Sequence, residues 1–123
     1  MKKYSLSYDD ERDVLYVTFR QSGRAATQSL SPNIVLSYDR DLNQATGLTL
    51  IGFSEMIGAA TGRPLPIVLE HLAELRDDKR RMLLEILRQP PMTDYLRILD
   101  IDNGKVRVEV ISQPVLTGLL TPA

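Results

Sequence analysis

Two groups of carboxylates in this sequence have the residue types that bind a hard cation. The first lies in the stretch YDDERDVLYV, and the second follows thirty positions later, where the tetrapeptide Leu-Ser-Tyr-Asp is repeated. Carboxylate oxygens are the ligands that Mg²⁺ and Ca²⁺ prefer in proteins. If both groups lay at the same end of a sheet, they would hold one ion and support metal-assisted hydrolysis. The side chains concerned are Asp9, Asp13, Asp39 and Asp41.

The number of strands decides whether these acids meet. Residues 1–53 contain five short segments with a period of two or with many β-branched residues: YSLSY, VLYVTF, AATQSL, IVLSY and LTLIGF. Short turns between them predict an antiparallel β-meander of about five strands. Ser31-Pro32-Asn33 supplies the reversal that makes the count five. In a simple five-strand meander, the turns at 9–13 and 39–46 lie at opposite ends, so we interpret the acids as turn residues that bind local backbone N–H groups. We therefore predict no catalytic, cofactor or metal site, with the four aspartates as the alternative.

The repeated tetrapeptide suggests two related hairpins. Leu6-Ser7-Tyr8-Asp9 recurs as Leu36-Ser37-Tyr38-Asp39, and the strand that follows each copy ends in phenylalanine. The loop of the second copy is expected to be a few residues longer. Duplication of a hairpin explains the repeat, but we favour the reuse of the same residues at boundaries between strand and turn.

The same residues carry a family resemblance. Tyr8-Asp9, Asp13 and Leu15-Tyr16-Val17, followed by Ser37-Tyr38-Asp39, Asp41 and Gly47-Leu48, are similar to the motifs of a small bacterial family catalogued as domain of unknown function 2283. The first motif matches closely; in the second, Leu42 and Thr49 depart from the family pattern. The resemblance covers roughly residues 3–53. It implies a small β-rich module without an established reaction and, because some relatives resemble one half of a two-gene pair with a toxin, an antitoxin-like role.

Residues 54–89 change to a helical period. Ser54 is the predicted N-cap of a short helix that stops near Gly62. Pro66 suits the first turn of a longer helical pattern over 67–89, either one helix or two that meet near Asp77, a good N-cap. An apolar stripe marks its buried face. The stripe consists of Val68, Leu72, Leu75, Met82, Leu83, Ile86 and Leu87.

This helical segment also holds the one histidine and the one basic cluster. His71 has no second histidine for a metal pair, and we interpret it as a helix-boundary residue with its polar edge in water. The basic cluster is surrounded by acids, and we expect pairs from Asp77 to Arg81 and from Arg81 to Glu85 on a solvated face. A phosphate-binding surface for nucleic acid is the alternative reading. The basic cluster consists of Arg76, Lys79, Arg80 and Arg81.

Residues 92–113 return to a period of two. Asn103-Gly104 is a strong signal for a two-residue hairpin loop. Counting from this loop places Leu99 opposite Val108, Ile101 opposite Val106, and Asp100 opposite Arg107. The apolar tail, residues 114–123, is expected to dock on the body or on a second subunit.

Composition bounds the function. The chain of 123 residues fits one domain of the α+β class, with a net charge of −1 and no cysteine. No apolar run is long enough to span a bilayer, and no signal peptide is evident, so we expect a cytoplasmic protein. The sequence predicts a non-enzymatic interaction or regulatory module that self-associates, without cofactors. The alternatives are an antitoxin-like partner of a neighbouring toxin, a metal-dependent hydrolase, and a nucleic-acid binder.

Overall fold

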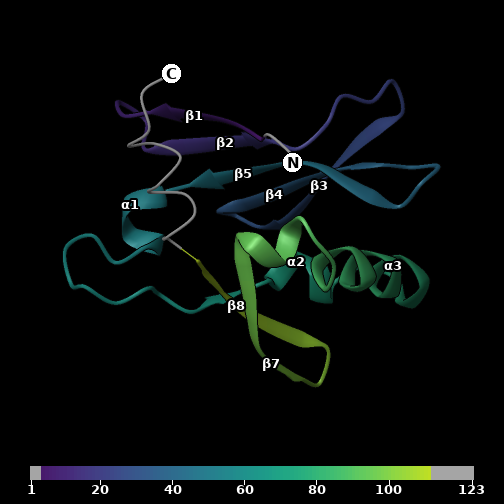
Figure 1. Cartoon of the computed structure of the whole chain (residues 1–123). Coiled ribbons are helices and arrows are strands. Elements are labelled where there is room, and N and C mark those ends of the chain that lie inside the picture. Colours follow the sequence, from purple (N-terminus) through teal and green to yellow (C-terminus); the bar gives the residue numbers. More distant parts are fainter. Residues whose placement is uncertain (1–3, 112–123) are drawn as a thin grey trace.

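The computed structural model describes residues 4–111 of the chain, and it contains two antiparallel sheets with helices between them (Figure 1). The five-stranded sheet forms the upper part of the view, and the helices and the second sheet lie below it. Its strands are β1 (Ser5–Asp9), β2 (Val14–Thr18), β3 (Ala25–Ser31), β4 (Ile34–Asp39) and β5 (Gln44–Ile51). The predicted fold class and the five N-terminal strands are confirmed.

The strand order of this sheet is β1-β2-β5-β4-β3, and every neighbouring pair is antiparallel. The predicted meander is therefore present as the hairpin β1–β2 and the run β3–β4–β5. These two parts join so that β5, rather than β3, pairs with β2. Sequence periodicity cannot distinguish these orders, because both give each strand the same buried face.

The pairing register separates an inner face from an outer face. Leu6, Val17, Leu48 and Leu36 form one inner cross-strand row, and the next row is Tyr8, Leu15, Leu50 and Ile34. Except for Leu6 and Tyr8 on the edge strand β1, these side chains are buried. They form one core with the helices and the second sheet. This is expected of an antiparallel sheet whose strands alternate between apolar and polar residues, because its apolar face packs on the core.

The middle of the chain is less helical than its sequence pattern predicts. The elements are α1 (Phe53–Met56), β6 (Ile67–Val68), α2 (Glu70–Ala73), α3 (Asp77–Leu87) and the 3₁₀ turn η1 (Met92–Asp94). Two helices, rather than one, thus occupy the segment after Pro66. None of the helices in the described residues has the length and hydrophobicity needed to cross a membrane.

Several predicted boundaries in this segment are wrong. Gly52, and not Ser54, is the N-cap of α1, and Arg76, and not Asp77, is the N-cap of α3. Pro66 precedes the strand β6 instead of opening a helix, and Val68 is 37% exposed. The partner strand β8 explains the difference, because Ile67 and Val68 pair with it and this pairing overrides the helical period.

The second sheet has the order β6-β8-β7, with β7 (Leu96–Asp102) and β8 (Lys105–Val110) forming a hairpin that points away from the larger sheet (Figure 1). The loop at 103–104 and two predicted pairs are confirmed: Ile101 with Val106, and Asp100 with Arg107. The prediction for Leu99 is wrong. A register shift between Ile98 and Asp100 places Ile98 opposite Val108 and leaves Leu99 38% exposed. The tail at 114–123 lies outside the described residues.

Candidate functional site

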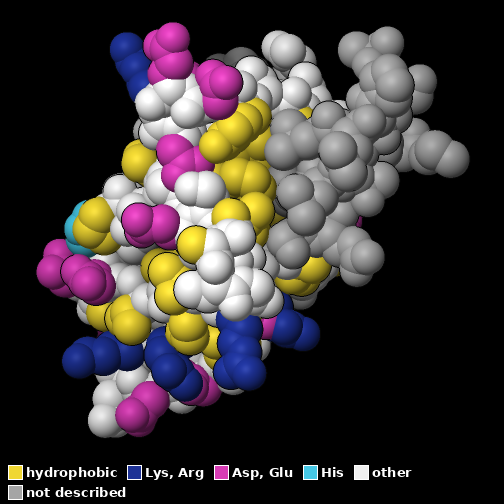
Figure 2. Space-filling view, turned by 90° about the vertical axis from the view of Figure 1, so that its left-hand side faces the viewer, with side chains coloured by type: hydrophobic (Ala, Val, Ile, Leu, Met, Phe, Trp, Pro, Cys, Tyr) yellow, Lys and Arg dark blue, Asp and Glu magenta, His cyan; other side chains and the backbone are white. Residues whose placement is uncertain are grey.

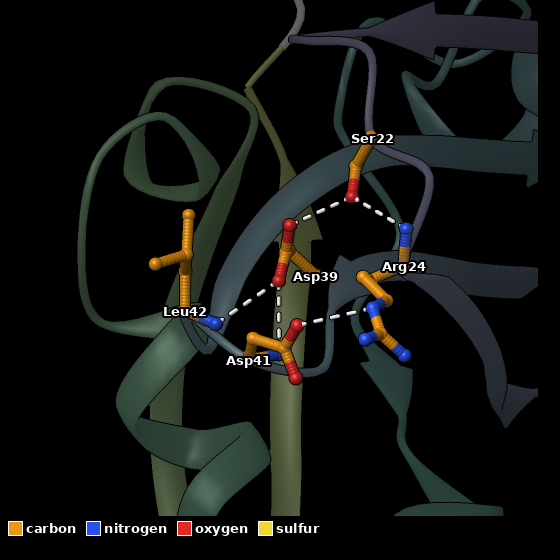
Figure 3. Close-up of polar contacts among 5 residues, drawn as sticks. All are labelled: Ser22, Arg24, Asp39, Asp41 and Leu42. Carbon is orange, nitrogen blue, oxygen red and sulfur yellow. Dashed lines mark hydrogen bonds and ion pairs between the residues drawn. The ribbon is translucent and has the colours of Figure 1, made fainter.

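The acidic turn between β4 and β5 is organised around the buried side chain of Asp39 (Figure 3). One carboxylate oxygen accepts hydrogen bonds from the backbone N–H groups of Asp41 and Leu42, at 2.9 and 3.0 Å. The other accepts a hydrogen bond from the Ser22 hydroxyl at 2.7 Å. Arg24 closes the arrangement, since its backbone N–H donates to Ser22 and its side chain forms an ion pair with Asp41.

These hydrogen bonds favour the charged form of Asp39. The Ser22 hydroxyl is the main cause that holds the pKa of this carboxyl below its ordinary value, and the backbone N–H groups and the charge of Arg20 add to it. The carboxylate of Asp39 thus accepts hydrogen bonds from the β4–β5 turn and from the loop that follows β2. This is the use predicted from sequence: aspartate that binds nearby backbone N–H groups in a turn.

The turn between β1 and β2 repeats part of this geometry. Asp9 accepts backbone hydrogen bonds from Glu11 and Arg12, two and three residues later, as Asp39 does from Asp41 and Leu42. Both turns also end in a residue with positive φ, Asp13 at 56° and Asn43 at 50°. The loops have equal length, so the prediction of a longer second loop is wrong. The second copy instead carries a register shift within the strand pair, between Ser37 and Tyr38.

Asp13 has a second role, because its carboxylate connects two distant parts of the chain. It accepts hydrogen bonds from the Tyr8 hydroxyl at 2.6 Å, from the Ser54 hydroxyl at 2.6 Å and from the Ser54 backbone N–H at 3.0 Å. Its backbone carbonyl accepts the N–H groups of Gly52 and Phe53. Burial alone would raise the pKa of Asp13, but the hydrogen bonds from Ser54 and Tyr8 outweigh it and lower the pKa. Asp13 therefore fixes the start of α1 against the first hairpin.

The four candidate metal ligands do not come together. The β1–β2 turn lies beside the end of β5, where Asp13 binds Gly52, whereas the β4–β5 turn lies beside the loop after β2, where Asp39 binds Ser22. Asp9 and Asp13 are thus at one end of the sheet, and Asp39 and Asp41 are at the other. Within residues 4–111, no group of three acidic, histidine or cysteine side chains is placed to hold a metal ion.

His71 lies on α2, partly buried against β3. Its Nδ1 is 2.7 Å from the hydroxyl of Ser29, and that hydroxyl donates a hydrogen bond to the backbone carbonyl of Ser31. Because a hydroxyl has one proton, the Ser29 oxygen then accepts from an Nδ1–H group of the imidazole. His71 is therefore a tether between α2 and an edge strand.

The basic cluster is divided between two roles. Arg80 points back toward α2, where it donates to the carbonyls of Ala73 and Leu75 and pairs with Asp77. Arg76 pairs with Asp78 on the surface. The predicted pair between Asp77 and Arg81 is wrong, because Asp77 binds Arg80 instead, and no ion pair joins Arg81 to Glu85 among the described residues. The surface part of the cluster therefore consists of Arg76, Lys79 and Arg81, one residue fewer than the sequence suggests.

Two surfaces of the described residues remain as candidate sites. On the side of α1 and the 57–66 loop, hydrophobic side chains form a band, and most of the Lys and Arg side chains visible on this face gather at its lower end (Figure 2). The outer face of the five-stranded sheet is the second surface. Two of its cross-strand rows hold no charged side chain, a feature that strand-by-strand inspection of the sequence does not reveal. The rows are Ser7, Tyr16, Thr49, Val35 and Ser29, and then Ser5, Thr18, Gly47, Ser37 and Thr27.

The fold and these surfaces define a small α+β protein built on a five-stranded antiparallel sheet. Residues 6–54, from β1 to the start of α1, match the family model described as a protein of unknown function (DUF2283). The resemblance noted from the paired turn motifs is thus confirmed for this segment. Neither curated proteins nor solved structures give a match.

Proposed function

We propose that this protein is a non-enzymatic interaction module that self-associates through the outer face of its five-stranded sheet. The observation that carries the proposal is the absence of charge from the two central rows of that face. Charged residues make up 25% of the chain, yet none of the ten residues in these rows is charged. The cores of protein interfaces are depleted in charged residues and enriched in tyrosine.

The shape and charge of the face fit a second copy of the chain. Tyr16 is 43% exposed, and Ile51, in the neighbouring row of the same face, is 38% exposed. Tyr16 and Gly47 are among the residues that line a hollow of about 300 Å³ on the surface, which Arg20 also lines. In an isologous dimer, each copy places its own Tyr16 against the hollow of the other. The net charge of −1 opposes such a contact only weakly.

A charge placed at the centre of the face tests this proposal. We expect the wild-type chain to show a concentration-dependent dimer in sedimentation equilibrium, and Tyr16→Glu to remain monomeric, because the interface would bury an unpaired carboxylate. The matched control is Leu42→Glu, which adds the same charge at a residue that is 53% exposed in the β4–β5 turn, away from the face.

The control variant should dimerise as the wild type does. A wild-type chain that stays monomeric at several hundred micromolar contradicts the proposal, and so does a Tyr16→Glu variant that dimerises normally. Circular dichroism of each variant establishes that the sheet is intact.

A further inference from the structure

We propose that a cavity below the five-stranded sheet is a binding site for a small aromatic carboxylate. The cavity has a volume of about 360 Å³ and lies between one end of the sheet and the end of α3. A cavity of about 150 Å³ is enough to hold benzene in other proteins. The space here therefore accommodates a ring, its carboxylate and a few further atoms.

One part of the cavity wall is formed by aromatic rings and prolines. Tyr4 and Phe19 both line the cavity and meet edge to face, with ring centroids 5.1 Å apart. Tyr95 packs behind both rings, at 6.1 and 5.5 Å, and so holds them in place. Pro90 and Pro91 line the part contributed by the segment after α3. Rigid aromatic and proline surfaces of this kind accept a planar ring with little loss of side-chain entropy.

The polar part of the wall carries a single formal charge. Arg20 is the one charged residue among those that line the cavity, and its guanidinium donates a hydrogen bond to the Gln44 side chain. This bond leaves other N–H groups of the guanidinium available, since arginine has five donors. The charge of Arg20 helps to lower the pKa of Asp39, but the oxygens of that carboxylate are already bound by Ser22 and by the turn. An anionic ligand thus meets an oriented cation.

The elements that surround the cavity determine how such a ligand is oriented when it is bound. The sheet side contributes Arg20 and Gln44, whereas the helix side contributes Ile86, Gln89 and the two prolines at the C-terminal end of α3. A helix C-terminus carries partial negative charge and disfavours an anion. The carboxylate therefore lies toward Arg20, and the ring lies toward the prolines and the aromatic pair.

Titration with benzoate, followed by ¹H–¹⁵N spectra, tests the site in the full chain. We expect saturable shifts at Phe19, Gln44 and Gln89. Benzamide, which has the same shape without the charge, should bind about tenfold more weakly or worse, and acetate, which has no ring, should give no saturable shifts. Arg20→Gln should reduce the affinity for benzoate by a similar factor.

Arg24→Gln is the matched control, because Arg24 lies at the same end of the sheet but pairs with Asp41 and does not line the cavity. Its affinity for benzoate should equal that of the wild type. Equal affinity for benzoate and benzamide in the wild-type chain overturns the proposal, as do shifts that avoid the lining residues or an Arg20→Gln variant that binds normally. The comparison of the two ligands needs no variant, so it stands even if a substitution disturbs folding.

Discussion

Asp13 shows how much of this fold can depend on one side chain. Its carboxylate binds Tyr8 in the preceding strand and Ser54 at the start of α1, and its backbone has a φ of 56°. Aspartate and asparagine tolerate this left-handed conformation better than most residues, because their short side chains bond locally. The position therefore selects a residue that accepts both the conformation and the hydrogen bonds.

Substitution of Asp13 by asparagine removes the charge of the side chain but keeps a residue that tolerates the left-handed conformation. We expect Asp13→Asn to lower the free energy of unfolding by about 1–3 kcal/mol at pH 7, because hydrogen bonds to a charged acceptor are replaced by weaker ones. The pKa of Asp13 is lowered in the folded state, so its contribution is complete above the ordinary value of 3.8 and is lost as the pH falls through the lower, folded value.

Urea unfolding at pH 7 and at pH values below 3.8 checks both parts of this prediction. The difference between wild type and variant should shrink as the pH falls. Asp10→Asn is the control, because Asp10 is exposed in the same turn and should change stability little at either pH. A difference that persists unchanged at low pH would show that the charge of Asp13 is not responsible.

At the scale of elements, the short helix α2 depends on a neighbouring helix for its C-terminal end. Its four residues leave carbonyl groups without partners within the helix. Arg80, on α3, supplies donors to the carbonyls of Ala73 and Leu75 and is 25% exposed at its side chain. Carbonyl groups at and just after the C-terminal end of α2 thus accept hydrogen bonds from a side chain of α3.

Alanine substitutions along α3 test this arrangement. Arg80→Ala should destabilise the protein by about 1–2 kcal/mol, because two carbonyls and Asp77 lose a charged donor. Arg81→Ala, one position along the same helix, should stay within about 0.5 kcal/mol of the wild type. Chemical denaturation measures both. Equal effects of the two variants would mean that Arg80 acts only as a surface charge.

At the scale of the whole molecule, the two sheets share one core. Leu72 is fully buried on α2, and this helix packs against both β3 of the larger sheet and β8 of the smaller one. The segment that matches the family model ends at residue 54, before this helix begins. The inner face of its sheet is therefore covered by residues that lie outside that segment.

A cavity at Leu72 should therefore weaken both sheets together. Leu72→Ala is expected to cost about 2–5 kcal/mol, as for other fully buried leucines. Native-state hydrogen exchange should show the same loss of protection at Leu50 in β5 and at Val108 in β8. Leu42→Ala, at an exposed turn position, is the control and should change neither. Loss of protection in only one sheet would indicate two separately folding units.

Local chemistry in the sequence was sufficient for much of this structure. Alternating side chains and the reversal at Ser31-Pro32-Asn33 predict the five strands, and Asn103-Gly104 predicts the C-terminal hairpin loop. The role of Asp39 as a turn residue also follows from sequence, because its backbone partners are two and three residues away. Interactions of this range depend on neighbours in the chain and are therefore visible in it.

The sequence by itself determined that this is an α+β chain, where most of its strands and turns fall, and that two acidic turns resemble each other. Only the tertiary structure decided that β5 lies between β2 and β4, that Ile67 and Val68 form a strand, and that Asp13 binds Ser54. The two uncharged rows of the outer face and the cavity beside Arg20 also arise from this arrangement. The physical reason is that pairing and packing join residues far apart in the chain, and periodicity records only which face of each element is buried.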